Sequence, residues 1–252
     1  MKAITLHDKE IHNGSLILIN KAYPLVNQGV IKCRALSQAE QKDTNILLET
    51  KTAAVLAHIM EKLQCQEDII PVSGYRTLQE QSRIYEESLK MNGRDFTEKY
   101  VALPGHSEHQ SGLAIDLALR QEQIDFIRPE FPYEGICNLF REKALQCGFV
   151  ERYPSEKEAI TGIAHEPWHF RYVGYPHSLI MKENNLVLEE YMEFVKAYCN
   201  EGKRYITNIN SQEIEIFYVG AEDRLTRIEL PDEAIYQVSG NNIDGFIVTL
   251  WR

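Results

Sequence analysis

A proline between two histidines sets the strongest constraint on how this chain folds. Residues 164 to 171 read AHEPWHFR, in which His165, Glu166 and His169 have the spacing HExxH. On a helix, that spacing lets two histidines bind one zinc ion. Pro167 lacks the N–H of a helical hydrogen bond, so a helix here costs about 3 kcal/mol. The following residues, WHFRYV, alternate aromatic and polar side chains, which predicts a β-strand, and we reject the helical site.

The length and the net charge limit the domain organisation and the classes of function that this chain can have. The chain has 252 residues, of which 44% are hydrophobic and 25% charged, as in an ordinary globular protein. It is long enough for one large domain, or for one domain with a small appendage. The formal net charge of −10 argues against a general nucleic-acid binder, because such proteins need clustered Lys and Arg to displace counterions from phosphates.

The N-terminal segment and the cysteines predict a cytoplasmic protein. Charged and polar residues interrupt MKAITLHDKEIHNGSLILIN, so we expect no signal peptide. Apolar runs fall short of the ~20 residues of a membrane span, and no membrane association is expected. The cysteines are odd in number and scattered, without a CxxC pair, which is typical of a reducing compartment. They are Cys33, Cys65, Cys137, Cys147 and Cys199.

Hydrophobic periodicity predicts a mixture of helices and strands before residue 200. The clearest helix start is Thr77, because Thr77 and Glu80 form the capping box T-x-x-E. We expect a strand in residues 16–26 that runs into a turn at Pro24, and further strands at 69–73, 113–119, 149–152 and after Pro167. Helices are expected at 44–63, 77–91, 134–146 and 186–199.

The pattern changes after residue 200. Segments such as EIEIFYV and GFIVTLW alternate and are joined by turn residues, which predicts short strands. We therefore expect an α+β body in residues 1–199 and a small all-β appendage in residues 200–252. An appendage of about 50 residues is marginal by itself, so it should pack on the body.

Asp116 points to chemistry, because a carboxylate inside the apolar stretch LAIDLAL is costly unless it is paired or binds a metal. His109 lies seven residues earlier, so the two can share an ion only if the chain turns, most easily at Gly112. With His169 they provide two imidazoles and one carboxylate, a set typical of catalytic zinc with one position left for water. Glu166 would then take the proton of that water as general base.

These residues also have ordinary structural alternatives. A single histidine is more often a core or surface residue than a ligand, and we assign His106 and His165 to the surroundings of the site or to the surface. Asp116 could instead cap a turn or pair with an arginine. Three aromatic residues are expected to fill the core, namely Trp168, Phe170 and Tyr172.

Two motifs together resemble a known family. Residues 107 to 116 match S-x-H-x-x-G-x-A-x-D, and residues 166 to 169 match E-x-x-H. In this order they resemble the zinc D-alanyl-D-alanine peptidases of the VanX/VanY type. SGYRT, residues 73 to 77, is similar to the arginine motif of that family, and LINKAYPL is similar to a stretch of its VanY and VanXY branches. The resemblance spans about residues 16 to 180 and is closest to the soluble bifunctional VanXY branch, with D,D-dipeptidase and D,D-carboxypeptidase activity.

The resemblance implies a role for each matching residue. It places one zinc ion per chain on His109, Asp116 and His169, with Glu166 as the catalytic base. Arg76 would stabilise the oxyanion of the tetrahedral intermediate. The alternatives for this arginine are a surface position at the start of a helix and an ion pair with a core carboxylate.

Two further residues are implied in substrate binding, and two features depart from the family. Ser107 would hydrogen-bond the substrate, with a loop cap as its alternative, and Tyr75 would line the same pocket. Residues 200–252 have no counterpart in the short VanXY enzymes. Ser73 stands where an acidic residue is expected, which bears on the choice between dipeptide and longer substrates.

The expected fold is α+β, with a small antiparallel sheet that carries the zinc site, helices that flank it and a small all-β C-terminal appendage. The expected function is zinc-dependent hydrolysis of D-Ala-D-Ala and removal of the terminal D-Ala from cytosolic peptidoglycan pentapeptide precursors, which gives glycopeptide (vancomycin) resistance.

Two alternative functions stay open. One is an L,D- or other cell-wall peptide endopeptidase on the same scaffold. The other is a non-enzymatic zinc-containing binding module, against which Glu166 argues, because a structural zinc needs no general base. The expected partners are small peptides that end in D-Ala-D-Ala, and the oligomeric state is left open.

Overall fold

The computed structural model describes residues 2–26, 33–35, 46–199 and 202–252. The chain forms two compact units. The larger unit contains Ile19–Val187, and the β unit contains Met1–Leu18 together with Leu188–Arg252. The β unit therefore differs from the expected appendage of residues 200–252, because it also includes an N-terminal strand and the helix α7 (Leu188–Lys196), which packs on strand β9.

An antiparallel sheet forms the centre of the larger unit. Four strands in the described part of that unit lie in the order β4 (Ile69–Ser73), β5 (Ala114–Leu119), β7 (Glu166–Tyr172) and β6 (Phe149–Tyr153). Cα partners across β4, β5 and β7 place Ser73 beside Asp116, and Asp116 beside His169. Because neighbouring partners point to the same face of a sheet, the register alone brings these side chains together.

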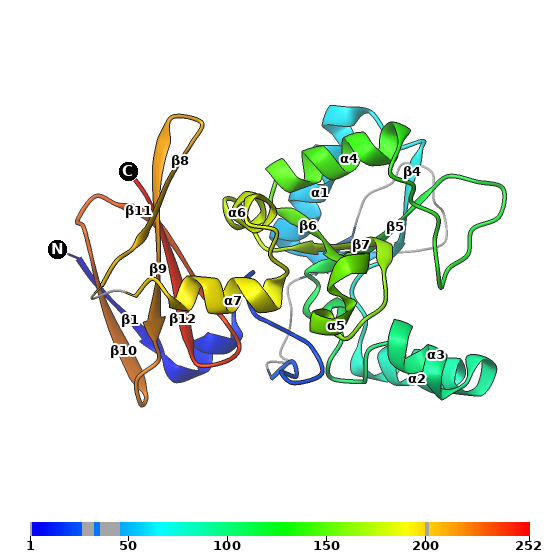
Figure 1. Ribbon diagram of the computed structural model, residues 1–252, viewed down its shortest axis with the longest axis horizontal. Helices are drawn as coiled ribbons and strands as arrows, with labels where there is room; N and C mark the ends of the chain where they lie inside the picture. Colours follow the sequence, from blue (N-terminus) through cyan, green and yellow to red (C-terminus); the bar gives the residue numbers. More distant parts are fainter. Residues whose placement is uncertain (1, 27–32, 36–45, 200–201) are drawn as a thin grey trace. The chain divides into compact units, whose positions relative to one another are not determined.

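Helices lie on both sides of this sheet. Figure 1 shows α1 (Thr50–Leu63) and α4 (Gly135–Gln146) on one side, and α5 (Glu158–Thr161) on the other. On the α4 side, Phe170 of β7 packs edge-to-face against Phe140 and Phe131, with ring centroids 5.3 and 5.4 Å away. The predicted core role of Phe170 is therefore confirmed, and its neighbour His169 points to the opposite face.

Further helices, strands and turns complete the larger unit. They are β2 (Cys33–Ala35), β3 (Leu47–Glu49), α2 (Leu78–Asn92), α3 (Arg94–Tyr100), α6 (His177–Glu183) and the 3₁₀ turns η2 (Glu108–Ser111) and η3 (Ser155–Lys157). No helix among the described residues is long and apolar enough to cross a membrane.

The predicted capping box is confirmed at the start of α2. The Thr77 hydroxyl accepts a hydrogen bond from the Glu80 N–H at 3.2 Å, and the Glu80 carboxylate accepts one from the Thr77 N–H at 2.7 Å. The expected helix at 44–63 begins later, at Thr50, because Leu47–Glu49 pair with β2 and the Glu49 carboxylate caps the helix. Thr44 lies outside the described residues.

The expected strand at residues 16–26 is wrong. None of these residues lies in a strand of the described structure, although Leu16 to Ile19 are buried. A tight turn follows, in which Asn20 and Tyr23 exchange backbone hydrogen bonds of 3.0 and 3.2 Å. The apolar run therefore reflects burial without sheet pairing, a distinction that periodicity cannot make in so short a segment.

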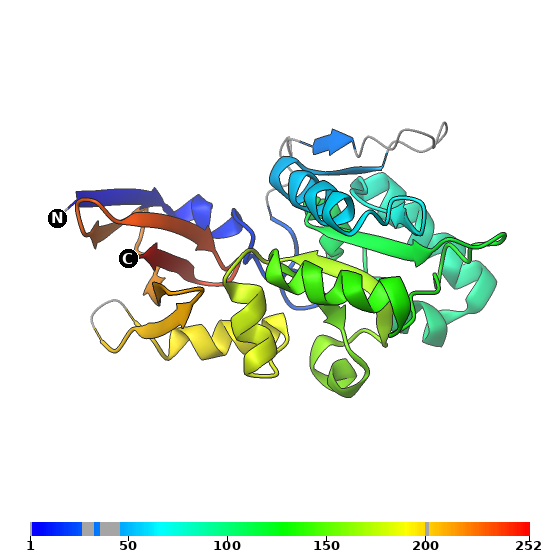
Figure 2. The same ribbon diagram turned by 90° about the horizontal axis from the view of Figure 1, so that it is seen from above.

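The β unit confirms the predicted C-terminal strands and adds one from the N-terminus. Its described strands form a sheet in the order β11 (Ile235–Gly240), β12 (Gly245–Trp251), β9 (Gln212–Gly220) and β8 (Tyr205–Ile209). A second pair joins β1 (Lys2–His7), which leads into the 3₁₀ turn η1 (Asp8–His12), to β10 (Leu225–Leu230). Figure 2 shows β1, in blue, alongside the C-terminal strands. Their shared core is Phe217, Ile228, Leu230, Val248 and Leu250.

Candidate active site

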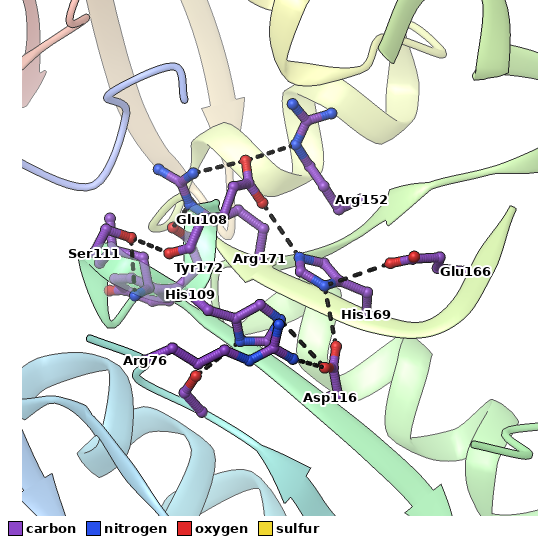
Figure 3. Close-up of polar contacts among 12 residues, drawn as sticks. Arg76, Glu108, His109, Ser111, Asp116, Arg152, Glu166, His169, Arg171 and Tyr172 are labelled. Carbon is purple, nitrogen blue, oxygen red and sulfur yellow. Dashed lines mark hydrogen bonds and ion pairs between the residues drawn. The ribbon is translucent and has the colours of Figure 1, made fainter. Parts of the chain in front are cut away.

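Three residues of the larger unit bring potential metal ligands to one point. His109 comes from η2, Asp116 from β5 and His169 from β7, and one ligand atom of each lies within 4.8 Å of the others. Asp116 Oδ2 is 3.2 Å from His109 Nε2, and Asp116 Oδ1 is 3.0 Å from His169 Nδ1. All three residues are buried, and Figure 3 shows both imidazole rings directed toward the Asp116 carboxylate.

The predicted turn at Gly112 is confirmed and explains how His109 reaches Asp116. Gly112 has a φ of +70°, and its N–H donates to the His109 carbonyl at 3.1 Å. A Cβ at this position would lie 2.8 Å from the Glu49 backbone nitrogen. Glycine is therefore required both by the left-handed backbone and by the close approach of the neighbouring chain.

In each imidazole ring, the nitrogen that faces away from Asp116 has its own hydrogen-bond acceptor. His109 Nδ1 donates to the Gly74 carbonyl at 2.8 Å, and His169 Nε2 lies 3.3 Å from Glu108 Oε2. In a neutral imidazole with this arrangement, the nitrogen that faces Asp116 carries no proton. Asp116 Oδ1 is buried and has no hydrogen-bond partner among the described residues. This oxygen and the two ring nitrogens beside the carboxylate fit a cation, and two imidazoles with one carboxylate suit zinc.

The charges of the site also favour a cation. Burial opposes ionisation of Asp116, but the His109 and His169 imidazoles hold its pKa well below its usual value. Burial and the nearby Arg76 charge lower the pKa of His109, which keeps that imidazole neutral. Burial alone would lower the pKa of His169 as well, but the Asp116 and Glu108 carboxylates raise it to about 9. The position between these groups thus attracts positive charge.

Glu166 lies at the edge of this cluster, at the first position of β7. Its Oε2 is 3.7 Å from His169 Nδ1, and its side chain is only 8% exposed. Burial raises the pKa of Glu166 to about 8, and the negative charge of Asp116 adds to the rise. A carboxylate with a raised pKa in a buried site can both accept and return a proton near neutral pH.

Arg76 lies on the other side of Asp116 and is held by several partners. Its Nη2 donates to Asp116 Oδ2 at 3.0 Å, and its Nε donates to Ser73 Oγ at 2.9 Å. Gln81 Oε1 accepts from Nη1 at 3.3 Å. The arginine thus pairs with a core carboxylate, as one alternative proposed, and it also provides a fixed positive charge beside the cluster.

The two expected substrate-binding residues, Ser107 and Tyr75, differ in burial and in their surroundings. Ser107 is 3% exposed and directly precedes η2, and its side chain does not cap that turn. Tyr75 is half-buried, and burial together with Cys33 and Glu80 raises its pKa. Within the described residues, no hydrogen bond joins the Tyr75 side chain to the three potential metal ligands, so its role stays a prediction.

His165 and His106 lie outside the cluster of donors. His165 Nε2 is 2.8 Å from the Tyr133 hydroxyl, and His106 Nδ1 is 2.8 Å from the Asn20 carbonyl. Because β7 begins at Glu166, the HExxH spacing lies on a strand and not on a helix, as Pro167 predicts.

Sequence reasoning missed three charged residues behind His169. Glu108 Oε1 accepts hydrogen bonds from Arg152 Nε and from Arg171 Nη1, both at 2.8 Å, and the side chains of all three residues are at most 1% exposed. Burial opposes ionisation of Glu108, but the two guanidinium groups hold its pKa well below its usual value. Arg171 could have been found, because it is two residues after His169 in a strand and so shares its face.

Comparison with known proteins agrees with this geometry. The family model VanY, D-alanyl-D-alanine carboxypeptidase, matches residues 45–175. The bifunctional D-Ala-D-Ala dipeptidase and D-Ala-D-Ala carboxypeptidase VanXYC of Enterococcus gallinarum is 43% identical to this chain over 183 residues. The match covers 72% of this chain and 95% of that protein.

Two solved structures extend the comparison. The vancomycin resistance D,D-dipeptidase VanXYg, in complex with a D-Ala-D-Ala phosphinate analogue, is 55% identical, with a TM-score of 0.94 and coverage of 100% of this chain and 99% of that one. The vancomycin resistance D,D-pentapeptidase VanY from a VanB-type cassette, in complex with Zn(II), is 30% identical, with a TM-score of 0.59 and coverage of 71% and 98%. On these grounds the chain belongs to the VanY family of D-alanyl-D-alanine carboxypeptidases.

Proposed function

We propose that this enzyme is a zinc-dependent D,D-peptidase that hydrolyses the dipeptide D-Ala-D-Ala and also removes the terminal D-Ala from peptidoglycan pentapeptide precursors. The observation that carries the proposal is the buried cluster of His109, Asp116 and His169, with the Glu166 carboxylate 3.7 Å from His169. The similarity to VanXYC, which is both a dipeptidase and a carboxypeptidase, supports the two substrates.

One zinc ion per chain is proposed at this cluster. His109 Nε2, His169 Nδ1 and the Asp116 carboxylate would hold it, since these atoms converge and the other nitrogen of each ring has its own hydrogen-bond acceptor. A zinc ion bound there supplies a Lewis acid for the scissile carbonyl and makes water a nucleophile near neutral pH. The solved VanY structure that contains Zn(II) supports this choice of metal.

Glu166 is proposed to move the proton in the reaction. Its carboxylate takes a proton from the attacking water, and the oxygen of that water forms the new bond to the carbonyl carbon. When the C–N bond of the amide breaks, Glu166 returns the proton to the departing amine, so water is consumed and D-alanine leaves. The Glu166 carboxylate lies 3.7 Å from His169 Nδ1, beside the proposed metal position, so it is placed to serve both transfers.

Arg76 and Ser107 are proposed to bind and orient the substrate. The Arg76 guanidinium, held by Ser73 and Gln81, places positive charge where the carbonyl oxygen becomes negative. The Ser107 hydroxyl, which does not cap η2, is proposed to hydrogen-bond the substrate. The same proposal includes Tyr75 as a lining residue, and it assigns all of this chemistry to the larger unit.

The proposed location is the cytoplasm, and the proposed role is glycopeptide resistance. The described cysteines are free thiols, and burial raises the pKa of Cys65 and Cys137 to about 11, which makes them unreactive core residues. In the cytoplasm the enzyme would meet both substrates before the precursor crosses the membrane. Hydrolysis of both would remove the D-Ala-D-Ala end that vancomycin binds.

The test is D-alanine release from D-Ala-D-Ala and from a pentapeptide that ends in D-Ala-D-Ala, with zinc added. Glu166→Gln should lower kcat by roughly 10²- to 10⁴-fold on both substrates, the usual contribution of a general base, while zinc binding persists. Glu142→Gln is the matched control, because Glu142 is an exposed glutamate on α4, and it should leave both rates unchanged.

The substrates separate the proposal from its rivals. A third peptide that ends in L-Lys-D-Ala tests the L,D-specific alternative, and cleavage of this peptide alone would replace the D,D-specificity. A folded, zinc-loaded protein that releases D-alanine from none of the three peptides would end the peptidase proposal and favour a binding module.

A further inference from the structure

Both carboxylate oxygens of Glu108 contact buried arginine or histidine side chains. One carboxylate oxygen, Oε1, accepts from the guanidinium groups of Arg152 and Arg171, each at 2.8 Å. The other oxygen, Oε2, lies 3.3 Å from His169 Nε2. The Glu108 side chain is fully buried, with an exposed fraction of 0%. Solvent therefore provides no competing partner for any of these atoms.

This arrangement determines where His169 carries its proton. Both arginines are always protonated and act only as donors, so two positive charges keep Glu108 ionised and occupy Oε1. An ionised carboxylate is only an acceptor, so Oε2 requires a donor, which His169 Nε2–H supplies. A histidine that binds a metal is neutral and keeps a single N–H, so this contact places the proton on Nε2 and leaves Nδ1, 3.0 Å from Asp116 Oδ1, as the nitrogen that can bind the metal.

His109 also has its proton on the nitrogen that faces away from Asp116, but its hydrogen-bond acceptor is different. Its Nδ1 donates to the Gly74 carbonyl at 2.8 Å, which leaves Nε2 without a proton 3.2 Å from Asp116 Oδ2. A backbone carbonyl is neutral and belongs to the scaffold, whereas Glu108 is a charged side chain that two arginines hold in place. Figure 3 shows Glu108 on one side of the His169 ring, and Asp116 and Glu166 on the other.

We propose that Glu108, held by Arg152 and Arg171, is a positioning residue that fixes the ring orientation of His169 and its Nε2–H tautomer, so that Nδ1 is presented to the metal. The inference rests on the metal site of the proposed function. Carboxylates that accept from a metal-bound histidine typically change metal affinity by roughly 10- to 100-fold. We expect an effect of that size for Glu108.

The test is Glu108→Gln in the full chain. Both arginines will still bind the carboxamide oxygen, so the NH₂ group will face His169 Nε2 and place a donor against a donor. The variant then favours the tautomer with a proton on Nδ1, at the position of the metal. We expect zinc affinity, measured by competition with a chelator at fixed pH, to fall by roughly 10- to 100-fold.

Glu151→Gln is the matched control. Glu151 Oε2 binds Arg141 Nε at 2.9 Å, and its Oε1 lies 3.7 Å from His165 Nε2, so the same exchange again removes charge beside an arginine and a histidine. His165 lies outside the metal cluster, and zinc affinity should not change. Glu108→Asp is the conservative variant, because it keeps an ionised acceptor, and we expect a smaller loss than in Glu108→Gln.

The histidine tautomer gives a readout that a purely structural role of Glu108 would not move. Proton–nitrogen correlation spectra of zinc-loaded protein with ¹⁵N-labelled histidine should show His169 protonated at Nε2 and zinc-bound through Nδ1. This measurement uses the native chain and stays valid if Glu108→Gln fails to fold. Binding of zinc through Nε2 would overturn the proposal.

The outcomes also separate this inference from the proposed function. If the native chain binds zinc and releases D-alanine, but Glu108→Gln binds zinc as tightly with the same tautomer, the positioning role is wrong and the peptidase stands. If the native chain neither binds zinc nor releases D-alanine, both proposals fail. Weakened zinc binding in Glu108→Gln alone, with Glu151→Gln unchanged, supports the positioning role.

Discussion

Two groups of side chains in the larger unit each place a glutamate between arginine and histidine, but they differ in their access to solvent. The inner group consists of Glu108, Arg152, Arg171 and His169, whose side chains are at most 4% exposed. Each of its ionic contacts is made without water as a competing partner. The group can therefore fix the direction of individual hydrogen bonds.

The outer group consists of Glu151, Arg141, His165 and Tyr133, and it is partly open to solvent. Glu151 again lies between an arginine and a histidine, but 33% of the His165 side chain is exposed. The Tyr133 hydroxyl donates to Glu151 Oε1 at 2.5 Å and lies 2.8 Å from His165 Nε2. Here the carboxylate joins the loop before α4 to the beginning of β7.

His165 and His169 differ in the partners of their ring nitrogens. His165 and His169 are four residues apart, and each lies near a glutamate that also binds an arginine. Only His169 has a second buried carboxylate at its other nitrogen, where Asp116 Oδ1 is 3.0 Å away. A histidine thus becomes a candidate ligand through the surroundings of both nitrogens.

The largest difference between the two groups should appear in zinc affinity when the histidine of each group is replaced by alanine. His169→Ala deletes a proposed ligand, and the loss of zinc affinity should exceed the roughly 10- to 100-fold effect of losing a hydrogen-bonding partner. His165→Ala should keep zinc affinity within about 2-fold, because this residue lies outside the donor cluster. Chelator competition measures both variants, and equal losses would remove the distinction.

A smaller difference should appear in stability. Glu108→Ala leaves two buried guanidinium groups without their carboxylate, which should lower the free energy of unfolding by about 3–5 kcal/mol. Glu151→Ala removes a carboxylate whose partners are partly solvated, and should cost about 1.5–3 kcal/mol. Urea unfolding of the zinc-free proteins measures both values. A larger loss for Glu151→Ala would reverse the order of the two groups.

The smallest effect concerns the Tyr133 hydroxyl of the outer group. Tyr133→Phe removes its hydrogen bonds and should lower the free energy of unfolding by about 1 kcal/mol at pH 7.5. Burial, followed by the Glu151 carboxylate, raises the pKa of Tyr133 well above its usual value. In the unfolded chain the phenol ionises near pH 10, so this contribution is lost as pH rises above about 10.

The pH dependence provides the internal check on that variant. Urea unfolding should be measured at pH 7.5 and at pH 10.5. The difference in the free energy of unfolding between the native protein and Tyr133→Phe should be smaller at the higher pH. The other tyrosines titrate alike in both proteins and cancel from the difference. A deficit that grows with pH would mean that Tyr133 is ionised in the folded protein, contrary to the raised pKa.

The sequence predicted those parts of the site that lie on regular elements. Strand alternation placed Asp116 and His169 on strands, and their pairing in β5 and β7 then brings them together. The T-x-x-E box predicted the start of α2, because a cap depends on residues that are close in sequence. Gly112 predicted the turn for the same reason.

What the sequence did not predict depends on contacts between distant residues. Glu108 lies in a single 3₁₀ turn, which has no periodicity to show which side is buried, and its arginines come from two other strands. The strand β1 was missed because its partner β10 is more than 200 residues away, as the pairing of Lys2 with Leu230 shows. Local patterns cannot identify such a partner.

The pairing of β1 with β10 also determines the order in which the molecule can be completed during synthesis. The larger unit has all of its residues between Ile19 and Val187, so it can fold while the ribosome is still making the C-terminal strands. The strand β1 is made before the larger unit, but its partner Leu225–Leu230 is made only after that unit. A strand that is made before the larger unit therefore finds its partner only after that unit has been made.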